Sequence, residues 1–342
     1  MPETPADPPG LDLARLRAHL DRELPGAVQG QLRAELIEGG RSNLTYRLTD
    51  GTACRVLRRP PLGHVLATAH DMGREYRVMT ALRDSGVPVP RTLLIDPGTD
   101  VLGAPWYLME YVSGTAHRDA ATLAALGEQR VRALGRRLVE TLAALHRIDP
   151  AGVGLADFGH PDGYLERQLR RWSKQLAASR SRDLPELDRL HALLAERLPV
   201  SPAPALVHGD YRLDNVLVDD ADAITAVLDW EMSTLGDPLT DVGLLVMYTE
   251  LAGVGGGIIP SAMAAQGFPK PDEIVSYYAE LTGRQAADLD WYVAFASFKL
   301  AAVAEGIFYR YQQGRTLGTG FERAGEMVPV LARHGLSTLK ES

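Results

Sequence analysis

The chain has 342 residues, a formal net charge of -8 and a single cysteine, Cys54. This length favours two domains over one, the acidic balance argues against a general nucleic-acid binder, and one cysteine excludes an internal disulfide or a multi-cysteine metal site. No apolar run comes near the roughly 20 residues that span a bilayer, and the N-terminus lacks a signal-peptide pattern, so we expect a cytoplasmic protein that binds neither nucleic acid nor a membrane.

The first third of the chain is predicted to form a small β-sheet with one helix packed within it. Apolar residues recur at helical spacing in residues 11–24 and again in 68–86. Between these helices, residues 31–59 contain short β-like runs separated by turn residues. Strand-like runs return at 87–96 and 103–114, which completes the predicted sheet.

The rest of the chain is predicted to be mostly helical. A long helix is expected at 120–148, two short strands flank a polar loop within 205–220, a third strand follows at 223–231, and a glycine-rich loop covers 253–268. Further helices are expected at 162–179, 185–198, 237–251, 271–283 and 286–314. These patterns divide the chain into an N-terminal lead-in and helix (1–30), a β-rich lobe (31–112) and a larger helical lobe (113–342).

The polar loop in "ALVHGDYRLDNVLVDD" is the first candidate site, because it places His208, Asp210 and Asn215 between two apolar runs. Taken by itself, the loop could be a turn that uses these residues for backbone geometry. However, its H-x-D-x-x-x-x-N spacing matches the catalytic loop of kinases, and Asp229 ends an apolar run 14 positions after Asn215. Asp210 could accept the proton of an acceptor hydroxyl. The oxygens of Asn215 and Asp229 are hard ligands that suit Mg²⁺.

The first candidate nucleotide-binding segment is "EGGRSN", whose small residues would let backbone N–H groups approach phosphate oxygens. Its candidate residues are Gly39, Gly40, Ser42 and Asn43. An ordinary glycine hairpin is the alternative for this segment.

Two further segments of the β-rich lobe carry candidates for nucleotide binding. In "CRVLRR", alignment with the kinase pattern V-A-I-K places Val56 against the adenine and Arg58 at the lysine position. The neighbouring Arg55 and Arg59 leave this register open, and Glu75 on the next helix would pair with the cation. The backbone of "YLMEYVSG" would bond the adenine edge at Glu110, Tyr111 and Val112. The alternatives are a solvated basic strand, a surface glutamate and a buried strand that ends at Gly114.

Taken together, these motifs resemble the aminoglycoside phosphotransferase family of kinase-like proteins, over about residues 30–250. The resemblance is carried by "GGRSNLTY", "REYRVMTAL", "VPVP", "YLMEYVSG", "LVHGDYRLDNVLVD" and "AVLDWEMSTLGDPLTDVG". "RVLRRPPLG", "AHDMGREYRVM" and "WEMSTLGDPLTDVG" resemble more closely the branch found as a kinase-like domain fused to acyl-CoA dehydrogenases.

The resemblance implies an α+β, bilobal protein-kinase-like fold, with a small β-rich lobe that binds ATP or GTP with Mg²⁺. It implies Asp210 as the catalytic base and Asn215 and Asp229 as metal ligands. Arg58 would replace the usual lysine, and His208 and Asp241 would brace the catalytic loop. The implied activity is transfer of the γ-phosphate to the hydroxyl of a small molecule.

The acceptor and one competing function stay open at this point. The fused branch implies a hydroxyacyl-CoA or a related metabolite rather than an aminoglycoside. A CoA ester would need basic groups, and the tail offers Lys299, Tyr309, Arg310 and Arg315, which could equally belong to a solvated amphipathic helix. The alternative function is a pseudokinase-like module that binds nucleotide without efficient transfer. A protein kinase is disfavoured, because no activation segment from D-F-G to A-P-E is recognisable.

Overall fold

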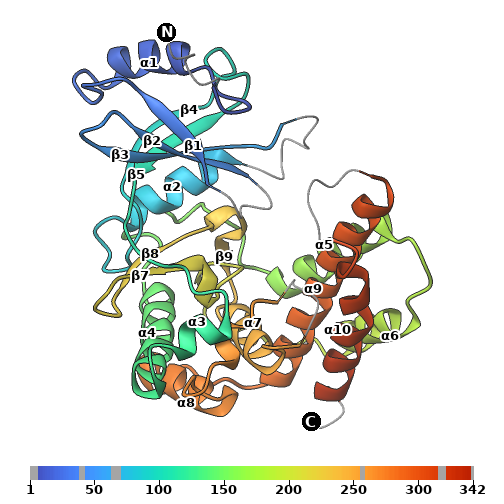
Figure 1. The fold of residues 1–342 in the computed structure, drawn as a ribbon. Helices are drawn as coiled ribbons and strands as arrows, with labels where there is room; N and C mark the ends of the chain where they lie inside the picture. The colour runs from blue at the N-terminus through green and yellow to red at the C-terminus, as the bar shows by residue number, and fades with distance from the viewer. Residues whose placement is uncertain (1–6, 38–42, 63–70, 255–258, 315–320, 340–342) are drawn as a thin grey trace. The chain divides into compact units, whose positions relative to one another are not determined.

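The computed structural model describes residues 7–37, 43–62, 71–254, 259–314 and 321–339 (Figure 1). The chain forms two compact units. The first unit comprises Met1–Ser113 and Thr225–Glu231, and the second comprises Gly114–Ile224 and Met232–Ser342. The first unit therefore takes in the initial helix and a seven-residue segment from far along the chain, which contains Asp229. The sheet-based first unit and helix-rich second unit confirm the predicted α+β class.

A five-stranded antiparallel sheet in the order β1-β2-β3-β5-β4 organises the first unit. Its strands are β1 (Arg33–Leu36), β2 (Leu44–Thr49), β3 (Cys54–Arg59), β4 (Thr92–Asp96) and β5 (Trp106–Glu110). The helices α1 (Leu13–Glu23) and α2 (Met72–Leu82) lie on opposite sides of this sheet (Figure 1). Both helices begin after an aspartate, Asp12 or Asp71, whose side chain accepts a hydrogen bond from the first helical turn.

Successive side chains of a strand point to opposite faces of the sheet, so the two faces have different residues. Leu16 and Leu20 of α1 pack in one apolar core with Tyr46, Leu57 and Trp106 of the strands. Residues one position along, such as Arg58 and Tyr107, are paired across β3 and β5 and point to the other face. The helix α2 packs against β4 and β5. This second face therefore brings a charged side chain of β3 close to a helix.

Helices dominate the second unit, with α9 at its core. They are α3 (Ala120–Ala124), α4 (Glu128–His146), α5 (Tyr164–Ser179), α6 (Pro185–Glu196), α7 (Leu239–Glu250), α8 (Pro271–Thr282), α9 (Leu289–Gln312) and α10 (Ala324–Thr338). By length and composition α9 could cross a membrane, contrary to the expectation that no segment could. However, 78% of its most apolar stretch is buried inside the protein, and it packs against α5, α6, α7 and α10. Such burial on all sides is what a core helix requires.

Short strands and 3-10 turns surround the polar loop. They are β6 (Ala205–Val207), η1 (Leu213–Asn215), β7 (Val216–Val218), β8 (Ile224–Val227), η2 (Trp230–Met232), β9 (Thr234–Gly236) and, further on, η3 (Ala262–Ala264). The strand β6 pairs antiparallel with β9. The loop from His208 to Asn215 therefore begins at a fixed strand and ends at another.

The structure differs from the predicted elements at four places. The expected helix 120–148 is divided into α3 and α4 at Gly127, whose φ of 86° favours glycine and ends the helical geometry. The expected strand 223–231 ends at Val227, because Asp229 has a φ of 66° and leaves the extended region. Neither β9 nor α10 was predicted; β9 has only three residues, and α10 contains Pro329, which argues against a helix.

Candidate functional site

In the second unit, the loop that carries Asp210 turns sharply at Gly209. Gly209 has a φ of 83°, and a Cβ atom there would lie 2.7 Å from the carbonyl oxygen of Met232. Both the backbone geometry and the close approach therefore demand glycine at this position. This turn directs the chain from β6 toward Asp210. We refer to residues 208–215 as the Asp210 loop.

Asp241, in the first turn of α7, braces the backbone of this loop. Its carboxylate accepts the N–H of His208 at 2.7 Å and the N–H of Gly209 at 2.8 Å. His146 contacts the same carboxylate through Nε2 at 3.2 Å, and Tyr278 Oη lies 2.8 Å from His146 Nδ1. Burial raises the pKa of Asp241, but these bonds and the nearby imidazoles outweigh it and hold the pKa below its usual range.

His208 is fully buried and also acts on the backbone, since its Nδ1 accepts the N–H of Asp210 at 3.2 Å. Its ring is 5.7 Å from that of Tyr211 in an edge-to-face arrangement. These contacts hold the backbone of the loop in place. The imidazole therefore has a structural use that does not require proton transfer.

Asp210 presents a carboxylate that is 23% exposed and surrounded by donors. Asn215 Nδ2 donates to the Asp210 carbonyl at 2.8 Å and to its carboxylate at 3.1 Å. Tyr248 Oη donates to Oδ1 at 3.2 Å, and Arg212 Nε lies 3.4 Å from Oδ2. Burial opposes the charge, but Arg212, Lys299 and His208 outweigh burial and lower the pKa of Asp210. The group is therefore an ionised carboxylate at neutral pH, as a proton acceptor must be.

Three residues next to Asp210 were not identified as partners from the sequence. Arg212 stacks on the ring of Tyr248, with Cζ 5.3 Å from the ring centroid. Lys299 of α9 donates a hydrogen bond to the Gly209 carbonyl. The position of Arg212 in the sequence does not indicate this stacking contact. Lys299 could have been identified, because it is a basic residue in the middle of an apolar helix, where a cation needs a partner.

In the first unit, a second set of charged groups gathers on the α2 face of the sheet. Arg58 Nη1 lies 3.3 Å from Glu75 Oε2, and Arg58 Nη2 lies 3.1 Å from Asp229 Oδ1. Tyr107 donates its hydroxyl to Glu75 at 2.8 Å. We call these four residues the Arg58 cluster. Its geometry includes the cation–glutamate pair expected of the β-rich lobe.

Burial controls the protonation of this cluster. It raises the pKa of Glu75, although the Arg58 charge opposes the shift. It also raises the pKa of Tyr107 well above the ordinary value, so this phenol stays protonated and donates. Burial disfavours the charge of Arg58, but the contacts with Glu75 and Asp229 more than compensate, and the pKa of Arg58 is raised. Arg58 therefore remains a cation.

The structure resolves the register that the sequence left open. Arg58 contacts Glu75, whereas Arg55 bonds the carbonyl of Ala27 and Arg59 bonds the carbonyls of Gly10 and Leu102. Two of the three arginines of β3 thus fix surrounding backbone. Arg58 is the arginine of this strand that faces the two carboxylates.

The other predicted nucleotide-binding residues lie on the same unit. Asn43 is buried and donates to Glu75 at 3.0 Å and to Glu231 at 3.3 Å. Val56 is buried and pairs with Met109 across β3 and β5. The predicted residues Gly39, Gly40 and Ser42 lie outside the described residues.

The segment predicted to bond the adenine edge, Glu110–Val112, begins at the last residue of β5. The N–H of Glu110 donates to the Arg91 carbonyl at 2.8 Å, so this amide is already used within the unit. Tyr111 is 40% exposed, and its ring centroid lies 5.4 Å from Cζ of Arg47. Val112 is half-buried and precedes the end of the first unit at Ser113.

The predicted metal ligands are chemically suitable, although they belong to different units. Asn215 uses its amide nitrogen on Asp210, which leaves the amide oxygen as the atom for a cation. Asp229 holds a carboxylate that is 28% exposed on a backbone in the left-handed region, a strained conformation typical of functional positions. Both offer hard oxygen donors that fit Mg²⁺. Within the described ranges, no group of three or more histidine, cysteine, aspartate or glutamate side chains is arranged to hold a metal.

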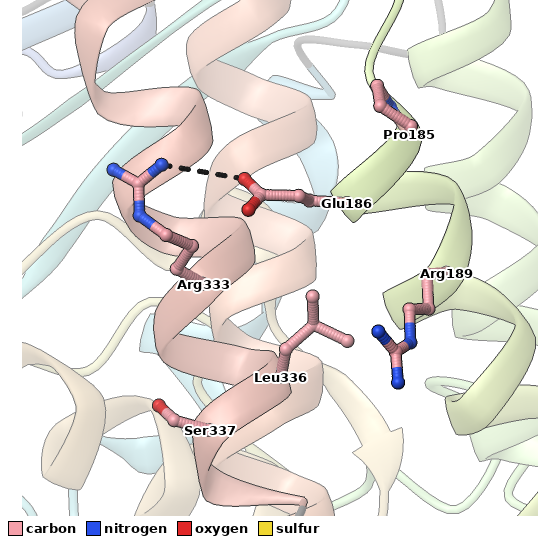
Figure 2. Close-up of a pocket in the computed structure, with 6 residues that line it drawn as sticks. All are labelled: Pro185, Glu186, Arg189, Arg333, Leu336 and Ser337. Carbon is pink, nitrogen blue, oxygen red and sulfur yellow. Dashed lines mark ion pairs between the residues drawn. The ribbon is translucent and has the colours of Figure 1, made fainter.

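The tail residues do not act as one set. Arg310 is exposed near the end of α9, Tyr309 is half-buried, and Arg315 lies outside the described residues. A separate surface pocket of about 560 Å³ lies between α6 and α10 (Figure 2). Its lining comprises Pro185, Glu186, Arg189, Arg333, Leu336 and Ser337. The ion pair of Glu186 with Arg333 spans 3.5 Å across it, and no predicted site residue lines it.

Comparison with known proteins places this geometry in a family. The model of the phosphotransferase enzyme family (APH) matches residues 33–272. The chain is 35% identical to acyl-CoA dehydrogenase family member 11 of Gallus gallus over 341 residues, which cover 96% of this chain and 44% of that protein. The chain thus spans less than half the length of this relative.

Solved structures support the same assignment. A candidate aminoglycoside phosphotransferase from Ralstonia eutropha is 33% identical, with a TM-score of 0.83, and the match covers 96% of this chain and 98% of that chain. Spectinomycin phosphotransferase in complex with ADP and spectinomycin shares the fold at 14% identity and a TM-score of 0.61, over 96% of this chain and 99% of that chain. These likenesses confirm the predicted kinase-like fold class. The chain belongs to the phosphotransferase enzyme (APH) family.

Proposed function

We propose that this protein is a small-molecule O-phosphotransferase that moves the γ-phosphate of ATP, or of GTP, to a hydroxyl acceptor. The observation that carries the proposal is the setting of Asp210. An ionised, partly exposed carboxylate is held by Asn215 on a loop whose backbone is braced by Asp241. A carboxylate so placed can orient a hydroxyl and accept its proton.

In the proposed reaction, Asp210 accepts the proton of the acceptor hydroxyl as the acceptor oxygen forms a bond to the γ-phosphorus. The bond between that phosphorus and the β–γ bridging oxygen breaks, and the nucleoside diphosphate leaves. Asn215 and Asp229 are the proposed ligands of Mg²⁺, which would neutralise phosphate charge when bound. Tyr248 and Arg212 hold the Asp210 carboxylate in orientation through contacts of 3.2 and 3.4 Å.

The first unit would bind the nucleotide. Arg58 would serve as the phosphate-pairing cation, oriented by Glu75, and its planar fork suits phosphate oxygens. Gly39, Gly40, Ser42 and Asn43 are the proposed phosphate loop. Val56 would pack on the base, and the segment Glu110–Val112 would bond its edge. The ADP complex of spectinomycin phosphotransferase supports nucleotide binding by this fold.

The acceptor is proposed to be a hydroxyacyl-CoA or a related metabolite rather than a polycationic aminoglycoside. Two basic side chains lie near Asp210: Arg212 contacts its carboxylate, and Lys299 donates to the carbonyl of the preceding Gly209. Cations near the reacting group would repel a polyamine and would tolerate an anionic or neutral acceptor. The likeness to a family of acyl-CoA dehydrogenases points to the same substrate class.

A transfer screen tests the proposal. Mg·ATP and Mg·GTP would be offered with aminoglycosides, amino alcohols, sugars and hydroxyacyl-CoA esters, and phosphorylated product would be measured. We expect transfer to one class, reduced by about 10³-fold or more in Asp210→Ala, because proton acceptance and orientation are lost together. Nucleotide affinity should stay within about twofold, since Asp210 is not a proposed nucleotide contact.

The matched control is Asp220→Ala, which removes an exposed carboxylate from the turn after β7. Near-normal turnover in Asp210→Ala would refute the role of the loop. Tight nucleotide binding without transfer across the whole panel would favour the competing function, a pseudokinase-like module. Arg58 in place of lysine is the feature that favours that second reading.

A further inference from the structure

Lys299 is a cation placed in the middle of the apolar helix α9. Its neighbours Phe298, Leu300 and Ala301 are all buried. Placing an ammonium group there is unfavourable unless the group is hydrogen-bonded. Its Nζ donates to the carbonyl of Gly209 and lies 5.5 Å from the ring centroid of Trp172. Lys299 is therefore a half-buried side chain with a specific hydrogen-bond partner, and not a freely solvated one.

The hydrogen bonds of the Asp210 loop show what this contact achieves. The N–H groups of His208 and Gly209 go to Asp241, the N–H of Asp210 goes to His208, and the carbonyl of Asp210 accepts from Asn215. The carbonyl of Gly209 accepts from Lys299. Gly209 is thus held from both sides, by a carboxylate at its N–H and by an ammonium at its carbonyl. The peptide held in this way is the one that leads into Asp210.

We propose that Lys299 is a positioning residue for phosphoryl transfer: by holding the Gly209 carbonyl, it fixes the peptide that aims the Asp210 carboxylate at the acceptor hydroxyl. This inference rests on the proposed function. Lys299 exchanges no proton in this role and makes no bond to the phosphoryl group. The rate of the chemical step therefore depends on it through Asp210. Small displacements of a reacting group are costly to such a step.

The kinetic test compares Lys299→Met with Lys299→Arg, using the acceptor found by the transfer screen. Methionine keeps the length and apolar stem but removes the donor and the charge, and we expect kcat to fall by about 10- to 100-fold. The KM for ATP should change by less than about twofold, because the lost interaction is not a nucleotide contact. Arginine retains a charged donor and should recover most of kcat. The control is Lys174→Met, at an exposed position of α5.

A double-mutant cycle separates positioning from general stability. If Lys299 acts through Asp210, Lys299→Met should reduce the residual rate of Asp210→Asn by less than about twofold. A loss of the full 10- to 100-fold in that background would show that Lys299 acts independently of Asp210, and would overturn the proposal. Equal kcat values for wild type and Lys299→Met would also overturn it.

A second measurement needs no activity. The sequence contains two Gly–Asp pairs, Gly209–Asp210 and Gly236–Asp237. Protein labelled with carbonyl-¹³C glycine and ¹⁵N aspartate therefore gives two inter-residue correlations, of which the Gly236–Asp237 signal is an internal reference. Lys299→Met should shift the Gly209–Asp210 signal and leave the reference in place. An unmoved Gly209–Asp210 signal would refute the contact.

The two proposals fail in different ways. A wild-type protein that transfers phosphate to no acceptor would overturn the proposed function. Wild-type transfer that Lys299→Met leaves intact would overturn the role of Lys299 and leave the function standing.

Discussion

The Arg58 cluster of the first unit and the Asp210 loop of the second both protect charged groups, but they hold them by different means. In the Arg58 cluster, side chains bind side chains: Arg58 pairs with Glu75 and Asp229. In the Asp210 loop, a buried carboxylate binds the backbone, at the N–H groups of His208 and Gly209. Mutation can remove both side chains of an ion pair, whereas it cannot remove a backbone N–H. The two sites should therefore respond differently to paired substitutions.

The largest effect on stability is expected at Asp241 in the second unit. Asp241→Asn would turn an amide donor toward two backbone donors and His146 in a fully buried setting. We expect the free energy of unfolding to fall by about 3 kcal/mol, as measured by urea denaturation. The transfer rate should fall as well, because the loop backbone loses its brace.

Adding His146→Leu to Asp241→Asn tests whether the lost stability comes from the backbone contacts of Asp241 or from its side-chain contact. The second substitution removes the side-chain partner of Asp241. The amide has one oxygen in place of two, so the N–H of His208 or of Gly209 still lacks an acceptor and stability should not return. Recovery of more than half of the lost stability would show that the backbone contacts matter little, and would break the contrast between the two sites.

A smaller effect is expected in the Arg58 cluster. Glu75→Gln leaves the buried guanidinium of Arg58 with Asp229 as its remaining carboxylate, and should lower the free energy of unfolding by roughly 2 kcal/mol. Adding Arg58→Met removes the cation as well. Because the costly part of the single variant is a buried cation that has lost a partner, the double variant should be more stable than Glu75→Gln alone.

Nucleotide affinity provides the control for that pair. The double variant should bind Mg·ATP more weakly than wild type even where its stability is restored, since Arg58 is the proposed phosphate cation. A double variant that stays as unstable as Glu75→Gln would show that the lost stability does not come from the Arg58 charge but from another contact, such as the hydrogen bond from Tyr107 to Glu75.

The same contrast explains what could be predicted from the sequence. Asp210 and Asn215 are five positions apart in one loop, so their pairing has a local signature, and Asp229 is marked by the end of an apolar run. Lys299 reaches the same loop from 90 positions away. Its partner is a backbone carbonyl, which leaves no trace in the sequence of the loop. Such a contact requires the packing of α9 to be known.

The elements show the same limit. Alternation and helical spacing were sufficient for the sheet of the first unit and for most helices of the second. They failed where one backbone angle decides the outcome, at Gly127 between α3 and α4 and at Asp229 after β8. The spacing of apolar residues gives no sign of such a position, although the helix or strand ends there. The arginines of β3 show a further limit. The alternation of a strand restricts which arginine can face α2, but it does not show which carboxylates that arginine contacts.

The smallest effect on stability is expected at Asp50 in the first unit. Its carboxylate accepts backbone N–H groups, as that of Asp241 does in the second unit. The Asp50 carboxylate closes the turn between β2 and β3, accepting the N–H groups of Thr52 at 2.9 Å and Ala53 at 2.8 Å and, from outside the turn, that of Gln29 at 3.0 Å. These bonds lower the pKa of Asp50 strongly, the Gln29 bond most. Asp50→Asn should reduce the free energy of unfolding at pH 7 by about 1 kcal/mol.

The pH dependence of that difference tests the cause. Because the folded pKa of Asp50 lies below the value of about 3.9 for an unfolded aspartate, its contribution is fully present above pH ~4 and is lost as the pH falls from there toward the folded pKa. Urea denaturation of wild type and Asp50→Asn should therefore show a gap that is constant from pH 7 to 5 and narrows below pH ~4. A gap that persisted unchanged into strong acid would mean that the charge of the Asp50 carboxylate is not the cause of the difference. Bracing by a carboxylate would then be confined to Asp241 and the second unit.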